Sequence, residues 1–211
     1  SIPMPILHPE QEYSDEDYKE AAKWFLYAAQ SGNASAQYNL GALYQHGHGV
    51  EKSMKEAMYW YELAAAQNDS QALTTLGLLY HTGQAGEQNY EKAASLYKKA
   101  AQAGNAEAQY KLAECYNKGI GVSSLPYEAV KWYTEAANQG HAEAQYELAK
   151  CYKYGFGINH SYVDAVKWFH KAAEQGHIYA HNELGVCYAK GQGVEQSYIV
   201  AAKWHSEPAD K

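Results

Sequence analysis

The chain has 211 residues and a formal net charge of −7 at pH 7, and it is 46% hydrophobic and 19% charged. This composition is typical of a folded protein rather than a disordered one. The sequence contains no arginine. With the acidic balance, this argues against nucleic-acid binding, because phosphates need a basic face and arginine is the usual reader of base edges. No apolar run approaches the roughly 20 residues that span a bilayer, so we expect no membrane insertion.

The chain begins with an irregular segment and continues as a periodic one. Residues 1–14 contain prolines and are expected to form an extended lead, and residues 15–33 are expected to be a half repeat with only a second helix. From residue 34 the chain aligns with itself in 36-residue blocks without a gap: repeats 34–69, 70–105, 106–141 and 142–177, and a truncated repeat 178–211. Such periodicity is the sequence signature of a solenoid.

Columns of like residues define the blocks. They include the leucines Leu40, Leu76, Leu112, Leu148 and Leu184, the turn glycines Gly47, Gly83, Gly119, Gly155 and Gly191, and the alanines Ala21, Ala57, Ala93, Ala129, Ala165 and Ala201. All five tryptophans share one register, in which Leu96 replaces tryptophan in the second block.

Each block predicts two helices. Apolar residues such as Ala36, Leu40 and Leu43 share one face of the first helix, and Gly47 and Gly49 supply the left-handed backbone that ends it. The second helix is expected to start at a column of capping residues: Asp17, Ser53, Asn89, Leu125 (followed by Pro126), Ser161 and Ser197. The residues expected to cap the next first helix are Asn33, Asp69, Asn105, His141 and His177, with histidine the poorest.

Small residues allow the two helices to cross closely: Gly41, Gly77, Ala113, Ala149 and Gly185 in the first helix, and paired alanines such as Ala100 and Ala101 in the second. One hairpin cannot bury its apolar faces alone, so neighbouring hairpins must stack. The sequence therefore predicts an all-α fold, a right-handed superhelical α-solenoid of helix-turn-helix repeats.

The repeat pattern AxAQYxLGxxYxxGxGVxxSxxEAxxWYxxAAxQG resembles the Sel-one-like repeat, a relative of the tetratricopeptide repeat. The resemblance covers about residues 15–206 and departs most at Gln84-Ala85-Gly86, where we expect a differently shaped turn. It implies an adaptor or scaffold that binds protein partners, as in bacterial signalling or host–microbe contact, without a cofactor.

Three groups of residues invite a chemical interpretation. Cys115, Cys151 and Cys187 occupy a column that holds leucine in earlier blocks, so we expect core thiols rather than a disulfide or redox site. His177 and His181 are spaced for one helix face, but no motif completes a metal site. The tryptophan column is expected to be core rather than a stacking platform.

The resemblance also identifies a candidate binding surface. In tetratricopeptide-like hairpins the first helices line the concave side, and places 2, 5, 9, 12 and 13 of each block point into it. From these places we select Tyr38, Tyr110, Glu114, Lys118, Tyr146, Lys150, Lys153, Tyr154, Tyr179 and Lys190 as partner-binding residues. Tyrosine suits contact surfaces because it combines apolar area with a hydrogen bond. The lysines Lys150 and Lys153 are expected to steer an acidic protein or peptide segment.

Two alternatives remain open at this stage. The Helicobacter cysteine-rich relatives suggest a β-lactamase-like or penicillin-binding enzyme, but this chain lacks the S-D-N and K-T-G motifs of such enzymes and the second cysteine of those repeats. A structural spacer within a longer repeat protein, contacting further repeats of the same chain, is the other alternative. The compartment, cytoplasmic or bacterial periplasmic and secreted, is left open by the sequence.

Overall fold

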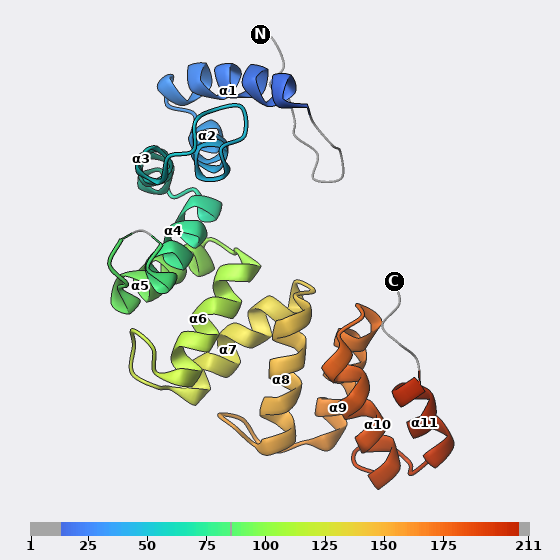
Figure 1. The fold of residues 1–211 in the computed structure, drawn as a ribbon. Coiled ribbons are helices and arrows are strands. Elements are labelled where there is room, and N and C mark those ends of the chain that lie inside the picture. Colours follow the sequence, from blue (N-terminus) through green and yellow to red (C-terminus); the bar gives the residue numbers. More distant parts are fainter. Residues whose placement is uncertain (1–13, 85, 207–211) are drawn as a thin grey trace. The chain divides into compact units, whose positions relative to one another are not determined.

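The computed structural model describes residues 14–84 and 86–206 of the chain, and in these residues it is all α-helical, without a strand (Figure 1). Residues 1–13 of the extended lead expected at 1–14, Ala85 of the second turn and residues 207–211 of the truncated last repeat lie outside the described residues. The helices are α1 (Asp15–Gln30), α2 (Ala34–His46), α3 (Met54–Ala66), α4 (Ser70–Thr82), α5 (Tyr90–Gln102), α6 (Ala106–Lys118), α7 (Pro126–Asn138), α8 (Ala142–Tyr154), α9 (Tyr162–Glu174), α10 (Ile178–Lys190) and α11 (Tyr198–Ser206).

The helices form two compact units, one up to Gly104 and one from Asn105 onward. In each unit the main contacts join consecutive helices, α1 to α5 in the first and α6 to α11 in the second. Each unit is therefore a stack of helical hairpins, as the solenoid prediction required.

The helix starts follow the predicted caps with one exception. Asn33, Asp69 and Asn105 accept from the third backbone N–H of the next helix at 2.8–2.9 Å. His141 and His177 also cap, through Nδ1, at the longer distance of 3.2 Å. Asp17 was wrongly expected to be a cap. The cap of α1 is Ser14, and Asp17 lies three residues later, where its carboxylate completes a capping box.

The turn inside each hairpin is closed by the backbone of a tyrosine that recurs near the end of each first helix, at Tyr44, Tyr80, Tyr116, Tyr152 and Tyr188. The N–H of the residue that precedes the second helix donates to this tyrosine's carbonyl, as from Ser53 to Tyr44 and from Ser161 to Tyr152. A Cβ on Gly157 would overlap the carbonyl oxygen of Pro126, so this loop packs directly on the start of α7. Only glycine, at φ +67°, fits there.

The turn of the second block differs, as the sequence predicted. Gly86 has φ +112°, and a Cβ added to it would meet no atom within 4 Å. Its N–H donates to Gly83 O within the loop. The column of Gly49 and Gly157 holds Ala85 in this block, so Gly86 stands one place after it.

The core contains a column of aromatic residues that sequence reasoning missed. Phe25, Tyr61, Tyr97, Tyr133 and Phe169 are each 0–2% exposed. The rings of Tyr61 and Tyr97 face the small residues Gly41 and Gly77 of the first helices, and a Cβ on Gly41 would lie 2.8 Å from the Tyr61 ring. The expectation that the neighbouring tryptophan column forms the core is only partly right, because Trp60 is buried whereas Trp132 is half-buried. Trp24, Trp168 and Trp204 are half-buried as well.

Buried glutamines tie successive hairpins together. Gln145 Nε2 donates to the carbonyl of Ala137 at 3.1 Å, and its Oε1 accepts from Gln175 Nε2 at 2.8 Å. Gln37 makes the same two contacts, with Ala29 and Gln67. An amide can donate and accept at once, so one side chain satisfies a helix-end carbonyl and joins a third helix.

The three cysteines are free and buried, as predicted for core positions. Burial raises the pKa of Cys115 and Cys151 to about 11, and it also raises the pKa of Cys187. Thiols held in the neutral form react slowly, because the thiolate is the nucleophile.

Candidate binding surface

The first-helix face consists of places 2, 5, 9, 12 and 13 of each block, on α2, α4, α6, α8 and α10. None of its residues is buried. Tyr154 and Tyr179 are 59% and 66% exposed, Lys118 and Lys190 are also exposed, and Glu114 is half-buried. The ten residues selected from the sequence are thus reachable from solvent, at least in part.

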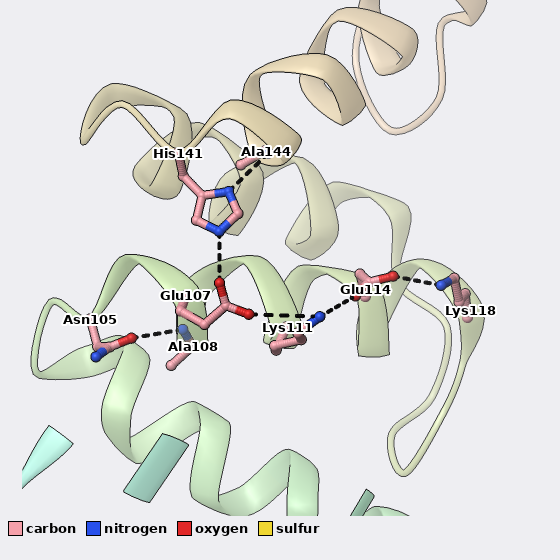
Figure 2. A network of polar contacts seen from close by, with 8 residues as sticks. All are labelled: Asn105, Glu107, Ala108, Lys111, Glu114, Lys118, His141 and Ala144. Carbon is pink, nitrogen blue, oxygen red and sulfur yellow. Dashed lines mark hydrogen bonds and ion pairs between the residues drawn. The ribbon is translucent and has the colours of Figure 1, made fainter. Parts of the chain in front are cut away.

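A chain of charges runs along α6 (Figure 2). Lys111 Nζ lies between Glu107, at 3.7 Å, and Glu114, at 3.4 Å, and Glu114 also pairs with Lys118 at 2.6 Å. His141, at the start of α8, reaches Glu107 at 2.9 Å. Because His141 Nδ1 accepts the Ala144 N–H, its proton is on Nε2, which donates to the carboxylate. This bond is the main reason why the pKa of Glu107 is lowered.

The next repeat carries a similar arrangement. His177 Nε2 donates to Glu143 at 3.1 Å while Nδ1 caps α10. Lys150 pairs with Glu147 at 2.9 Å, and Lys153 reaches across to Glu183 of α10 at 2.6 Å. Burial is the largest single influence and lowers the pKa of both lysines, but the hydrogen bonds to their glutamates and the charges around them together outweigh it, so the pKa of each is raised overall. The lysines expected to steer an acidic segment are therefore already paired.

Two tyrosines of this face lie flat against the capping histidines. Tyr110 stacks on His141 at 4.8 Å between ring centroids, and Tyr146 on His177 at 4.4 Å. Both tyrosines also pack against buried core clusters, and burial raises the pKa of both hydroxyls. Tyr146 thus belongs partly to the core, so its removal will cost stability as well as any binding.

The first-helix face of the N-terminal unit is nearly uncharged. Gln45 accepts a hydrogen bond from the buried Tyr61 hydroxyl at 2.7 Å, and Tyr38 packs beside the same ring. Leu78 is 46% exposed where the C-terminal unit has Glu114 and Lys150. The sequence predicts that this face changes from neutral to charged along the chain. The side chains that make this change are exposed or half-buried.

A model of the Sel1 repeat matches the chain at residues 11–33, 34–69, 70–105, 106–141, 142–177 and 178–209. The chain belongs to the Sel1 repeat family. No curated protein sequence matches it significantly.

Solved structures of Sel1-repeat proteins resemble this one closely. The protective antigen c5321 of uropathogenic Escherichia coli, which displays an SLR fold, is 38% identical at a TM-score of 0.85, over 87% of this chain and 39% of that one. A Sel1 repeat protein from Oxalobacter formigenes is 36% identical at a TM-score of 0.77, over 92% and 77%. The immunity protein PA5088 from Pseudomonas aeruginosa, 22% identical at 0.55 over 95% and 70%, shares the fold. This Sel1-repeat chain spans about two fifths of the length of the E. coli antigen.

Sequence reasoning missed one row of this surface and the role of the caps. Place 6 of the block supplies Lys111, Glu147 and Glu183, which pair with residues of the first-helix face. For Lys111 and Glu147 the opposite charge three residues later, at Glu114 and Lys150, was the available signal, whereas Glu183 lies 30 residues from Lys153 and leaves no local pattern. The histidines were considered as caps and as metal ligands, but their bonds to Glu107 and Glu143 join residues 34 apart and leave no local pattern.

Other chemical sites find little support in the described residues. Within residues 14–84 and 86–206 no three metal-ligating side chains come together. One S-x-x-K tetrapeptide is present, Ser95–Lys98, but Ser95 and Lys98 are both exposed on α5. No helix of the described part is long and apolar enough to cross a membrane.

Proposed function

We propose that this Sel1-repeat chain is a non-catalytic adaptor that binds a segment of another protein on its first-helix face, chiefly on α6, α8 and α10. Sel1 repeats form a scaffold of the kind that generally serves protein interaction. The observation that carries the proposal is the row of tyrosines and paired charges on these three helices.

The row has the properties of a contact surface. Tyr154 and Tyr179 are exposed, and Tyr110 and Tyr146 are held rigidly against histidines, so they would lose little entropy on binding. Ion pairs such as Lys153–Glu183 fix the polar groups in place before a partner arrives. Preorganised groups bind with a smaller entropic cost.

The paired charges refine the chemistry of the partner. Lys150 and Lys153 are neutralised by Glu147 and Glu183, so a uniformly acidic segment would meet carboxylates as well as ammonium groups. We propose a segment that carries both hydrogen-bond donors and acceptors together with apolar side chains for the tyrosines. Opposed charges on the surface then select against a segment in the wrong register.

The test uses the whole chain as bait and compares two double variants. Tyr179→Ala with Lys190→Glu changes exposed residues of the first-helix face, and the matched control, Tyr59→Ala with Lys98→Glu, changes exposed residues of the second helices α3 and α5. Proteins captured by the wild type are identified by mass spectrometry, and the binding of each purified candidate is measured by calorimetry.

The expected result is at least a roughly 30-fold loss of affinity in the first-helix variant, the scale of an interface hot spot. The control variant should bind within about threefold of wild type. If the first-helix variant bound as tightly as wild type and the control variant lost affinity, the partner would lie on the second helices and the proposal would be overturned.

A further inference from the structure

An apolar stripe lies along the loop edge of the C-terminal unit, where each first helix turns into its second helix. We call it the loop-edge stripe. It consists of Leu125 (48% exposed), Tyr127 (72%), Phe156 (60%), Val163 (53%), Tyr198 (70%) and Ile199 (75%). None of these residues belongs to the first-helix face.

The stripe is continuous because each hairpin loop packs on the preceding second helix. The loop that carries Phe156 is pressed through Gly157 against Pro126, which stands between Leu125 and Tyr127. The next loop is pressed through Gly193 against the backbone of Tyr162 and Val163, and Gln192 Nε2 donates to the Tyr162 hydroxyl at 3.0 Å. Tyr198 and Ile199 begin α11 directly after that loop.

The repeat architecture does not require apolar residues at five of these six places; the exception is the column of Tyr198, which holds Tyr18, Met54 and Tyr90 in the N-terminal unit. Tyr127, Val163 and Ile199 occupy one column, in which the N-terminal unit has Lys19, Lys55 and Glu91. Phe156 occupies the column of His48 and Gln84. The polar residues occupy the same kind of helix start and loop, so stacking alone leaves the stripe unexplained.

Leu125 gives independent evidence that the apolar residues of the stripe are not explained by stacking. It stands in the column of the capping residues Ser53, Asn89 and Ser161, and α7 has no side-chain cap. A helix start without a side-chain cap is less stable than one with a cap. The chain thus gives up local stability at the place where it adds exposed apolar area.

We propose that the loop-edge stripe is a self-association surface, on which a second copy of this chain packs through the same stripe in a two-fold dimer. The exposed area of the six side chains is on the order of 700 Å², close to the ~800 Å² that each partner of a stable complex buries. Monomers rarely expose a continuous apolar patch of this size.

The charges beside the stripe favour a second copy. Glu128, Asp164 and Glu195 are offset by Lys131, Lys167 and Lys190, and Lys167 pairs with Asp164 at 3.1 Å. The rim is therefore close to neutral, whereas the whole chain carries −7. A second copy that approaches through this edge therefore meets little like charge close to the contact.

The experiment measures the mass in solution of the full chain by sedimentation equilibrium, from about 1 to 100 µM. The test variant, Tyr127→Lys with Phe156→His and Val163→Glu, introduces residues that the chain itself carries in these columns at Lys55, His48 and Glu91. The matched control, Tyr27→Lys with Tyr59→Lys, removes two exposed tyrosines outside the stripe. Circular dichroism verifies the helical fold of each variant.

The wild type and the control should reach twice the monomer mass over this range, and the test variant should remain monomeric, with association weakened at least tenfold. A wild type that stays monomeric at 100 µM would overturn the proposal, whether or not the stripe binds another protein or a lipid surface. A dimer that persists in the folded test variant would also overturn it. None of these outcomes depends on binding at the first-helix face.

Discussion

Two neighbouring aromatic residues of α9, Trp168 and Phe169, test the packing most directly. Phe169 is 0% exposed and packs among Ala165, Leu184 and Cys187, whereas Trp168 is half-buried with Lys171 Nζ 4.1 Å above its ring. Removing a fully buried phenylalanine costs about 3–5 kcal/mol. Removing the tryptophan side chain loses roughly 100 Å² of buried apolar area, which corresponds to about 2.5 kcal/mol at about 25 cal/mol per Å².

Phe169→Ala should therefore lower the free energy of unfolding by about 0.5–2.5 kcal/mol more than Trp168→Ala. The assay is urea denaturation followed by far-ultraviolet circular dichroism. The dependence of the unfolding free energy on urea concentration is compared between variants, because a changed slope shows that a different part of the chain unfolds. The two residues lie in one repeat. If some repeats unfold before others, the measured unfolding free energies of both variants are affected alike. A third variant, Tyr27→Ala, removes a side chain that is 71% exposed and should cost under about 0.5 kcal/mol. If Trp168→Ala cost as much as Phe169→Ala, the tryptophan column would be the true core and the assigned register would be wrong.

Three further predictions follow from the turns, the thiols and the charge chain. Gly157→Ala, which forces a Cβ into the Pro126 carbonyl, should lower the unfolding midpoint in urea clearly more than Gly140→Ala, whose Cβ at φ +91° would meet no atom. Cys115 and Cys151, with pKa about 11, should react with iodoacetamide at a rate that rises about tenfold per pH unit between pH 7 and 10. Prompt labelling at pH 7 would contradict their burial. The lowered pKa of Glu107 contributes stability above the ordinary carboxyl pKa, and this stability is lost as the pH falls through the folded value. Glu107→Gln should flatten the fall of the melting temperature between about pH 5 and 3, whereas an unchanged slope would show that the His141 bond adds nothing.

Much of the fold could be predicted because its determinants are local. The caps Asn33, Asp69 and Asn105 stand at a fixed distance before each apolar run, and Gly47 ends a helix by its own backbone freedom. Asp17 was misassigned because it shares a column with Ser53, although Ser14, three residues earlier, starts α1 in this half repeat. A column alignment assumes equal helix starts, and α1 begins a turn earlier.

The centre of the core was harder to predict for a geometric reason. Trp132 and Tyr133 are neighbours, about 100° apart around the helix, and both columns are aromatic in nearly every block. Periodicity alone does not decide which of two adjacent large residues points inward. The deciding contact is with the opposite helix, where Gly41 leaves room for the ring of Tyr61. The small-residue column was recognised in the sequence, but its partner column was not.

The candidate binding surface was predicted in outline and not in its electrostatics. The selected residues are solvent-accessible, but the pairing of Lys153 with Glu183 joins residues 30 apart, and that of His141 with Glu107 joins residues 34 apart. Each bond depends on the stacking of one hairpin on the next, so it is set by tertiary structure. The sequence shows the charges, and only the fold shows which of them are satisfied within the chain.

The repeats also provide an internal comparison that separates architecture from function. A residue that recurs in every hairpin, such as Leu40 or Tyr61 and its equivalents, is explained by stacking. A residue that changes between the units, such as Ala42 to Lys150 or Lys55 to Tyr127, occupies the same structural place with different chemistry. Stability does not select such changes at exposed positions, because substitutions there alter it little. The charged part of the first-helix face and the loop-edge stripe both consist of such changes, and both lie in the repeats from Ala106 onward. Binding specificity in this chain is therefore expected to be concentrated in the C-terminal unit, with the N-terminal unit contributing mainly to the scaffold.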